Sequence, residues 1–351
     1  MNNQTSTPQN SRSNLPGWDL KDLYSGIDDP QIKKDLEEYR RLNQKLADNY
    51  KGKIADILPA DFYEALQIEE QSSIIGSKLG VYAYLNMVTQ MKNTEALAFY
   101  QNIDEKMTEY SKPSIFFTLE INKLSEPQFA KLAADEKVAY YKPFLERVRR
   151  FQAHELPEEQ EAIFLDKSVT SGGAWRRLYD EQSAALVYTV DGKEYNDAEI
   201  SKLLQDKDPL VREKAGKELN RVSRENARLF TFIYNMIVKD KAIGDEHHKY
   251  ASPVAARNLD NQVDDKALAS LTESGRFYKL KAKWLGKEKI QYWDRNAPLP
   301  FSSDKHYTWD ESVQIVLEAY QRFSPRLQEL ARPFFDSEHS WIDVPPRDGK
   351  R

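Results

Sequence analysis

Hydrophobic residues recur along most of the chain at the three- and four-residue spacing of helices that bury one face. The clearest stripe follows Asp208-Pro209, and its members share one face of a helical projection. They are Ala215, Leu219, Val222, Leu229, Ile233 and Ile237. Such a stripe is typical of core packing. Glycine is scarce, at 13 residues, and good helix formers fill the long stretches. The pattern predicts a mainly α-helical protein.

Prolines and capping residues mark where the predicted helices begin. Proline suits the first helical turn because the N–H that it lacks would have no partner there, and Ser, Thr or Asp can cap the exposed N–H groups. The expected starts are Leu58-Pro59, Ser125-Glu126-Pro127, Leu156-Pro157, Asp208-Pro209, Ser252-Pro253, Thr308 with Glu311, and Ser324-Pro325. The helix after Pro59 is expected to pass Gly76 and Gly80 and to end near Met91. The helix after Pro157 is expected to be interrupted at Ser171-Gly172-Gly173 and to resume at Trp175.

One segment, Ala185 to Tyr195, has the composition of strands instead. Val187 to Val190 favour a strand, and Asp191-Gly192 is a two-residue turn in which both positions tolerate positive φ. The segment therefore predicts a β-hairpin, with strands at 186–190 and 193–195. Asn196 and Glu199 are spaced as a capping box for a following helix.

Composition removes several functional classes. The 51 Lys and Arg against 56 Asp and Glu give a net charge of −5, without the basic stripe of a nucleic-acid binder. Arg147, Arg149 and Arg150 form a short cluster that we interpret as a solvated helix end. There are no cysteines, so disulfides and thiolate sites are excluded. No apolar run is long enough to span a membrane, and residues 1–14 form a polar segment, expected to be a disordered tail, without a secretory signal core. We expect a cytoplasmic protein.

The histidines permit an exhaustive search for zinc chemistry. They are His154, His247, His248, His306 and His339. A zinc peptidase helix needs two histidines four residues apart with a glutamate between them. His154-Glu155 begins such a match, but position 158 is Glu and Pro157 disturbs the required helix. We interpret it as a surface His–Glu pair just before a helix.

The densest group of possible ligands is Asp245-Glu246-His247-His248. Adjacent helical residues point about 100° apart, so the two histidines cannot easily share one ion. An exposed helix end is the favoured interpretation. Phosphate-binding glycine loops and Gly-x-Ser-x-Gly elbows are absent from the sequence. The residues themselves therefore predict no catalytic, cofactor-binding or metal-binding position.

Six segments, in their order and spacing, resemble the oligoendopeptidase F family of thimet-type zinc oligopeptidases. They are LPGWDLKDLY at 15–24, YKPFLE at 141–146, AWRRLYDE at 174–181, YASPVAAR at 250–257, YWDRNAPLP at 292–300 and AYQRFSP at 319–325. Trp341-Ile342-Asp343 and Gly349-Lys350-Arg351 resemble the family's approach to its catalytic core. The resemblance covers residues 15–351 and depends on the whole set, because no single segment is diagnostic.

The resemblance implies a multi-lobe helical peptidase with a small β-hairpin and a deep channel for short, unfolded peptides. In the family, a zinc ion held by His-Glu-x-x-His and a downstream glutamate activates water. Residues 15–110 would form the N-terminal helical lobe and residues 111–185 the accessory domain. Residues 186–351 would form the first part of the peptidase domain, truncated before the zinc helix.

The chain departs from the family pattern where the chemistry lies. Neither zinc histidines nor the catalytic glutamate occur before Arg351, so we expect no zinc binding and no hydrolysis by this chain alone. Between Leu271 and Lys281 the pattern also needs more residues than are present, with Gly275 at the apparent junction. Apolar side chains near Trp341 and Ile342 are expected to be exposed.

Other interpretations remain open. The chain could be a non-catalytic module that binds short peptides or docks with a separately encoded C-terminal, zinc-bearing half. It could also be an inert fragment of a split gene. Neither nucleic acid nor a membrane is expected as a partner.

Overall fold

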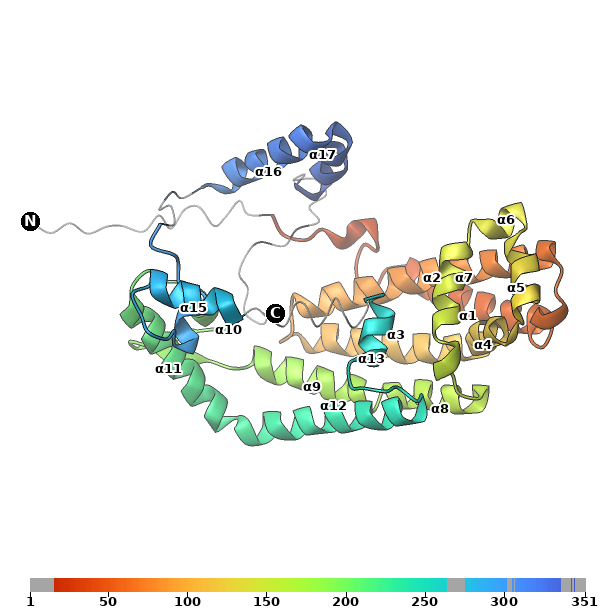
Figure 1. Ribbon diagram of the computed structural model, residues 1–351, viewed down its shortest axis with the longest axis horizontal. Coiled ribbons are helices and arrows are strands. Elements are labelled where there is room, and N and C mark those ends of the chain that lie inside the picture. Colours follow the sequence, from red (N-terminus) through yellow and green to blue (C-terminus); the bar gives the residue numbers. More distant parts are fainter. Residues whose placement is uncertain are drawn as a thin grey trace, which may run out of the picture.

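The computed structural model describes residues 16–263, 275–301, 305, 307–335, 342 and 344. Its described part is mainly α-helical with one small two-stranded sheet, as predicted. Figure 1 shows the helices arranged in groups that follow the order of the sequence. None of the described helices combines the length and apolarity needed to cross a bilayer.

Three long helices form the first group. They are α1 (Pro30–Tyr50), α2 (Pro59–Val88) and α3 (Thr94–Ser111), preceded by the short η1 (Leu20–Asp22), with η2 (Ile54–Asp56) between α1 and α2. They lie lengthwise against one another (Figure 1). As predicted, α2 continues through Gly76. A Cβ on Gly76 would lie 2.9 Å from the ring of Tyr39, so the glycine allows α1 and α2 to approach closely.

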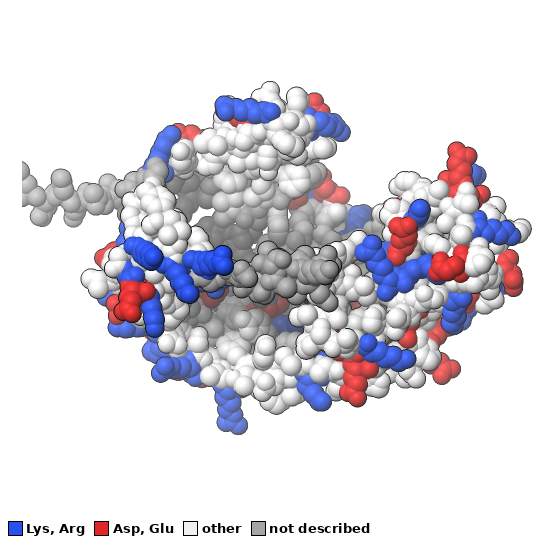
Figure 2. All heavy atoms as spheres, viewed as in Figure 1, with Lys and Arg blue, Asp and Glu red and all other residues white. Residues whose placement is uncertain are grey.

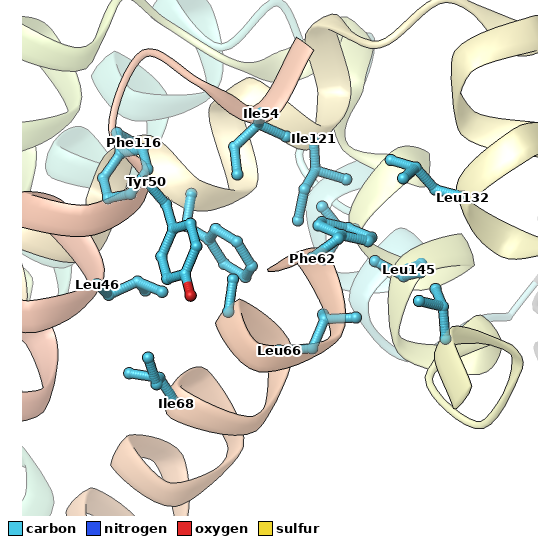
Figure 3. Packing of buried hydrophobic residues seen from close by; sticks show 14 of the residues in the cluster. Leu46, Tyr50, Ile54, Phe62, Leu66, Ile68, Phe116, Ile121, Leu132 and Leu145 are labelled. Atoms are coloured by element: carbon cyan, nitrogen blue, oxygen red, sulfur yellow. The ribbon is translucent and has the colours of Figure 1, made fainter. Parts of the chain in front are cut away.

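Short helices form the second group. They are η3 (Lys112–Ser114), α4 (Ile115–Lys123), α5 (Glu126–Ala133), α6 (Glu136–Ala139), α7 (Lys142–Arg150) and η4 (Gln152–His154). Their apolar side chains share one core with α1 and α2. Figure 3 shows Phe62 and Leu66 of α2 packed near Ile121 of α4 and Leu145 of α7. The two groups are therefore continuous in their packing.

Arg149 corrects the interpretation of the arginine cluster as a solvated helix end. Its side chain is only 12% exposed and pairs with Glu126. Its guanidinium donates to the backbone carbonyls of Ile121 (3.4 Å) and Leu124 (3.1 Å), at the end of α4. The last carbonyls of a helix lack helical partners, so a neighbouring cation stabilises them. Arg147 and Arg150 are exposed as predicted.

The third group contains α8 (Glu158–Ser168), α9 (Gly172–Ala184), α12 (Ala227–His247) and the short α13 (Ala255–Asp260). α9 and α12 pack side by side, with the rings of Trp175 and Phe232 in edge contact at 5.5 Å. The predicted aliphatic stripe continues from α11 (Pro209–Glu225) into α12, and the two helices meet at Asn226. Along it, Ala215, Val222 and Ile233 are buried, and the other members are partly buried.

The predicted hairpin is confirmed. β1 (Tyr188–Val190) pairs antiparallel with β2 (Lys193–Tyr195), and Tyr188 lies opposite Tyr195. Asp191 and Gly192 both have positive φ, 51° and 78°, as a two-residue turn between twisted strands requires. The capping box of Asn196 and Glu199 begins α10 (Asp197–Leu203).

A buried ion cluster holds α11 to the segment that follows α15 (Gly275–Trp284). Asp294, in η5 (Tyr292–Asp294), is fully buried and accepts hydrogen bonds from Arg212 of α11 at 2.9 Å and from Lys287. Burial by itself raises the pKa of Asp294, but the bonds from Lys287 and Arg212 outweigh it and lower that pKa. Gly216 allows this approach, because a Cβ there would lie 2.7 Å from Trp293.

The last described helices are α16 (Trp309–Phe323), α17 (Pro325–Ala331) and η6 (Arg332–Phe335). The predicted capping box of Thr308 and Glu311 begins α16. Val344 donates its backbone N–H to the carbonyl of Pro16 at 2.9 Å. Several predictions fall outside the described residues: the tail at 1–14, the junction at Leu271 and the exposure of Trp341. Ile342 is partly buried, so the expected exposure is not found there.

Candidate functional site

A cavity of about 790 Å³ lies where α8, α9 and α12 meet. Ile163, Phe164 and Ile243 supply apolar surface to it. Its polar lining includes Lys167, Ser168, Arg176, Asp240, Lys241, Asp245, His247 and His248. The volume lies within the range of about 300–1,000 Å³ that is typical of small-ligand sites. The cavity contains most of the predicted Asp245–His248 cluster.

Two glycines allow the three helices to converge at this cavity. The N–H of Gly172, at the start of α9, donates to the Asp240 carboxylate of α12 at 3.0 Å. A Cβ on Gly172 would lie 2.9 Å from that carboxylate oxygen, and one on Gly173 would lie 2.6 Å from the carbonyl of Ser168. The chain was predicted to resume its helix at Trp175, but α9 begins at Gly172 because Asp240 satisfies its first N–H group.

His248 is held on both sides of its ring. Its Nδ1 lies 2.8 Å from the carbonyl of Gly244 and its Nε2 lies 3.4 Å from the carboxylate of Glu161. The Nδ1 of His154 lies 2.8 Å from the carbonyl of His248 itself. Because a carbonyl only accepts, the Nδ1 atom of each histidine carries the proton. The two histidines therefore link η4 to the end of α12.

Tyr250 completes this junction. Its ring stacks on that of His154, with centroids 4.1 Å apart and planes inclined by 17°. Burial first, and then the negative charges of Asp245 and Glu161, raise the pKa of the Tyr250 hydroxyl. Tyr250 opens the segment 250–257 that carries part of the family resemblance, so this segment begins with a packing residue.

His154-Glu155 differs from the predicted surface pair, and this is a correction. Both residues are partly buried. Glu155 accepts a hydrogen bond from the Asn122 side chain at 2.5 Å, and burial raises the pKa of its carboxyl group. The sequence gives no signal for this burial, because Asn122 and His248 approach from distant segments.

The arrangement does not fit a zinc ion. Throughout the described ranges, no group of three or more His, Asp or Glu side chains converges as a metal ion requires. Asp245 pairs with Lys241, and the histidines at the junction are turned to carbonyls and to Glu161. His306 and His339 lie outside the described residues. What the cavity offers is a mixed surface on which Lys167 and Arg176 have no carboxylate partner among the described residues.

Comparison with known proteins agrees with this helical framework. The family described as Oligopeptidase F matches residues 120–188. An oligoendopeptidase F homolog of Borreliella burgdorferi is 21% identical over 95% of this chain and 57% of its own length. The structure of oligoendopeptidase-F from Enterococcus faecium has a TM-score of 0.66 at 20% identity, covering 82% of this chain and 62% of that one.

A structure of PZ peptidase A with an inhibitor has the same TM-score, 0.66, at 15% identity, covering 92% of this chain and 56% of that one. At such identities the structures show a shared fold. The chain spans little more than half the length of these relatives. The family match over residues 120–188, the related sequence and the shared fold agree with one another, and all three are similarities to oligoendopeptidase F-type peptidases.

Proposed function

We propose that this chain is a peptide-binding helical part of an oligoendopeptidase F-type metallopeptidase and does not hydrolyse peptides alone. One observation carries the proposal: the sequence contains no two histidines four residues apart. The described histidines are also turned toward packing partners. A zinc-bound water attacks at neutral pH because the metal lowers its pKa to about 7. Without the ligands, these residues cannot supply that nucleophile.

The proposed domains keep their predicted limits: residues 15–110, 111–185 and 186–351. The limit at residue 186 is supported by a small separate core formed by the hairpin, α10 and α11. This core includes Tyr188, Ile200 and Val222. The boundary at 110 divides the sequence but not the packing, because the core in Figure 3 joins α2 to α4 and α7. The helices from α1 to α7 would then unfold as one unit.

The test measures zinc content and hydrolysis of a mixed short-peptide substrate, with and without a chelator, on the purified chain. We expect no stoichiometric zinc and no turnover. Chelator-sensitive turnover would overturn the proposal, and loss of that turnover in His247→Ala and His248→Ala would then identify the site. A matched control is His154→Ala, which lies at the same junction but outside the cavity lining.

A second candidate function, docking with a partner polypeptide, is favoured by the surface of α16 and α17. Phe323 is 85% exposed, and Ile315 and Leu330 are about half exposed. Figure 2 shows a broad uncharged surface over these helices, with Lys, Arg, Asp and Glu toward its edges. Exposed apolar patches of this kind mark interaction surfaces.

The partner in this second candidate would resemble the part of the relatives that this chain does not span. Co-expression with such a polypeptide, carrying the His-Glu-x-x-His motif, should give a complex that co-purifies and that Phe323→Ser weakens. Separate elution of the two chains would remove this candidate and leave the first one standing.

A further inference from the structure

A second cavity, of about 460 Å³, lies in a different part of the molecule, between α2 and the start of α7. Leu66, Ile74 and Phe144 give it an apolar wall, and Tyr141 closes one side. Leu66 and Phe144 belong to or pack on the core in Figure 3, so this wall is fixed by the fold. Ile74 is 62% exposed and forms the rim.

Two carboxylates of α2 face this apolar wall without a cation. The hydroxyl of Tyr141 donates to Oε2 of Glu70 at 2.7 Å, which fixes the orientation of that carboxylate. Glu69 has only a long contact, 3.4 Å, from the hydroxyl of Ser73. Neither glutamate pairs with Lys or Arg among the described residues, and burial raises the pKa of the Glu69 carboxyl group. An anion withdrawn from water without a counter-ion is costly, so the site favours a ligand that brings a positive charge.

The apolar walls of the cavity limit which positively charged ligands can bind there. A hard metal ion keeps oxygen ligands on all sides, and Leu66, Ile74 and Phe144 offer none. An ammonium group needs hydrogen-bond acceptors at one end only, and its hydrocarbon body gains by leaving water. We propose that this cavity binds a primary ammonium group attached to an apolar body, with Glu69 and Glu70 as its acceptors.

The peptide amino terminus and the lysine side chain both have this chemistry, and the experiment separates them. Isothermal titration of the full chain would compare isoamylamine with isoamyl alcohol, and Leu-Gly-Gly with its N-acetylated form. Nα-acetyl-lysine amide is the third arm. We expect the amine to bind about tenfold or more tightly than the alcohol, because a charge-assisted hydrogen bond contributes about 1.5–3 kcal/mol. Binding of Leu-Gly-Gly alone assigns a peptide terminus, and binding of the lysine amide alone assigns a side chain.

Variants test the assignment of residues. Glu69→Gln should lower the affinity for isoamylamine by about tenfold. Glu64→Gln, which changes an exposed position of the same helix outside the cavity, should leave that affinity unchanged. Ile74→Ala should lower the affinity for isoamylamine more than the affinity for ethylamine. The ammonium group favours the charged carboxylate, so binding at acidic pH should release protons, which titrations in two buffers of different ionisation enthalpy detect.

Equal binding of the amine and the alcohol, or unchanged binding by Glu69→Gln, would overturn the proposal. Absence of binding by all the amines would do the same. These outcomes are independent of zinc content and hydrolysis, because the ammonium site does not depend on the proposed function of the chain.

Discussion

The helices before residue 150 and those after residue 275 make opposite use of their apolar side chains. In the first region, α1, α2, α4 and α7 enclose a continuous core in which Phe62, Ile121 and Leu145 are essentially fully buried. In the second region, the buried hydrophobic residues among those described are Ala282, Ala297 and Leu317. Its large apolar residues, including Phe323, lie mostly on the surface.

Local helix signals are equally good in both regions, so they do not explain the difference. Capping boxes begin both α5 and α16, and proline occupies the first turn of both α5 and α17. A helix gains most of its stability from tertiary packing of its apolar face. The second region therefore has well-formed helices whose apolar side chains are largely exposed. A docked partner, the second candidate function, would cover them.

The largest expected effect tests this comparison with two phenylalanines. Phe62→Ala should lower the free energy of unfolding by about 3–5 kcal/mol, because it removes a fully buried ring from the core. Phe323→Ala should change it by no more than about 0.5 kcal/mol, the usual limit for a surface substitution. Urea unfolding followed by circular dichroism measures both. A comparable loss in Phe323→Ala would show that α16 already has a packing partner within the chain.

The second prediction concerns how the second region is attached. Asp294→Asn should cost about 3 kcal/mol, because it leaves Arg212 buried without its counter-ion. Urea unfolding is again the measurement. Asp310→Asn, at an exposed position in the first turn of α16, is the matched control and should cost less than about 1 kcal/mol. If both variants lower the free energy of unfolding equally little, the packing of α11 against the segment after α15 does not depend on the buried ion cluster.

Two glycines of one helix give a smaller effect of opposite sign. Gly80→Ala should stabilise the protein by up to about 1 kcal/mol, because alanine is the better helix former and its Cβ would meet Met107 at an ordinary 3.7 Å. Gly76→Ala should lower the free energy of unfolding by about 1 kcal/mol or more, since overpacking against Tyr39 outweighs the gain in helix propensity. Thermal unfolding of the two variants gives the signs. Stabilisation by both would mean that α1 can shift away from α2.

Short-range patterns were enough to predict much of the fold. The hairpin, the capping boxes at Asn196 and Thr308 and the passage of α2 through Gly76 all depend on residues near one another in the sequence. The environment of charged groups was not predictable in this way. Arg149 was expected in solvent, but its partners are carbonyls more than twenty residues away.

The candidate site shows the same limit. The Asp245–His248 cluster is the densest group of possible ligands in the sequence, and most of it lines the 790 Å³ cavity. Gly172 contacts Asp240 inside the cavity, and His154 contacts His248 at the neighbouring junction, across 68 and 94 residues of sequence. A single sequence carries no periodic signal for such pairs. The sequence predicts a helix interruption at Gly172-Gly173, whereas in the structure the pair allows three helices to approach closely.

The smallest expected effect lies between the two regions, where Glu218 of α11 holds the hairpin. Hydrogen bonds from Arg221 and from the N–H of Thr189 lower the pKa of Glu218 from 4.5 to about 2. Between these two pKa values, the folded state therefore binds fewer protons than the unfolded state. The contribution to stability is complete above about pH 4.5 and is lost as the pH falls toward 2.

The magnitude should be modest, about 1 kcal/mol, because Arg221 is half exposed and solvent screens the pair. Comparing the unfolding free energy of the wild-type chain and Glu218→Gln at pH 7 and near pH 3 isolates it, since the difference between the two proteins should shrink in acid. Glu213→Gln, which changes an i,i+4 pair with Lys217 on the same helix, is the control. A difference that stays constant with pH would mean that Glu218 acts through its shape and the Thr189 contact, and that its charge contributes nothing to holding the hairpin on α11.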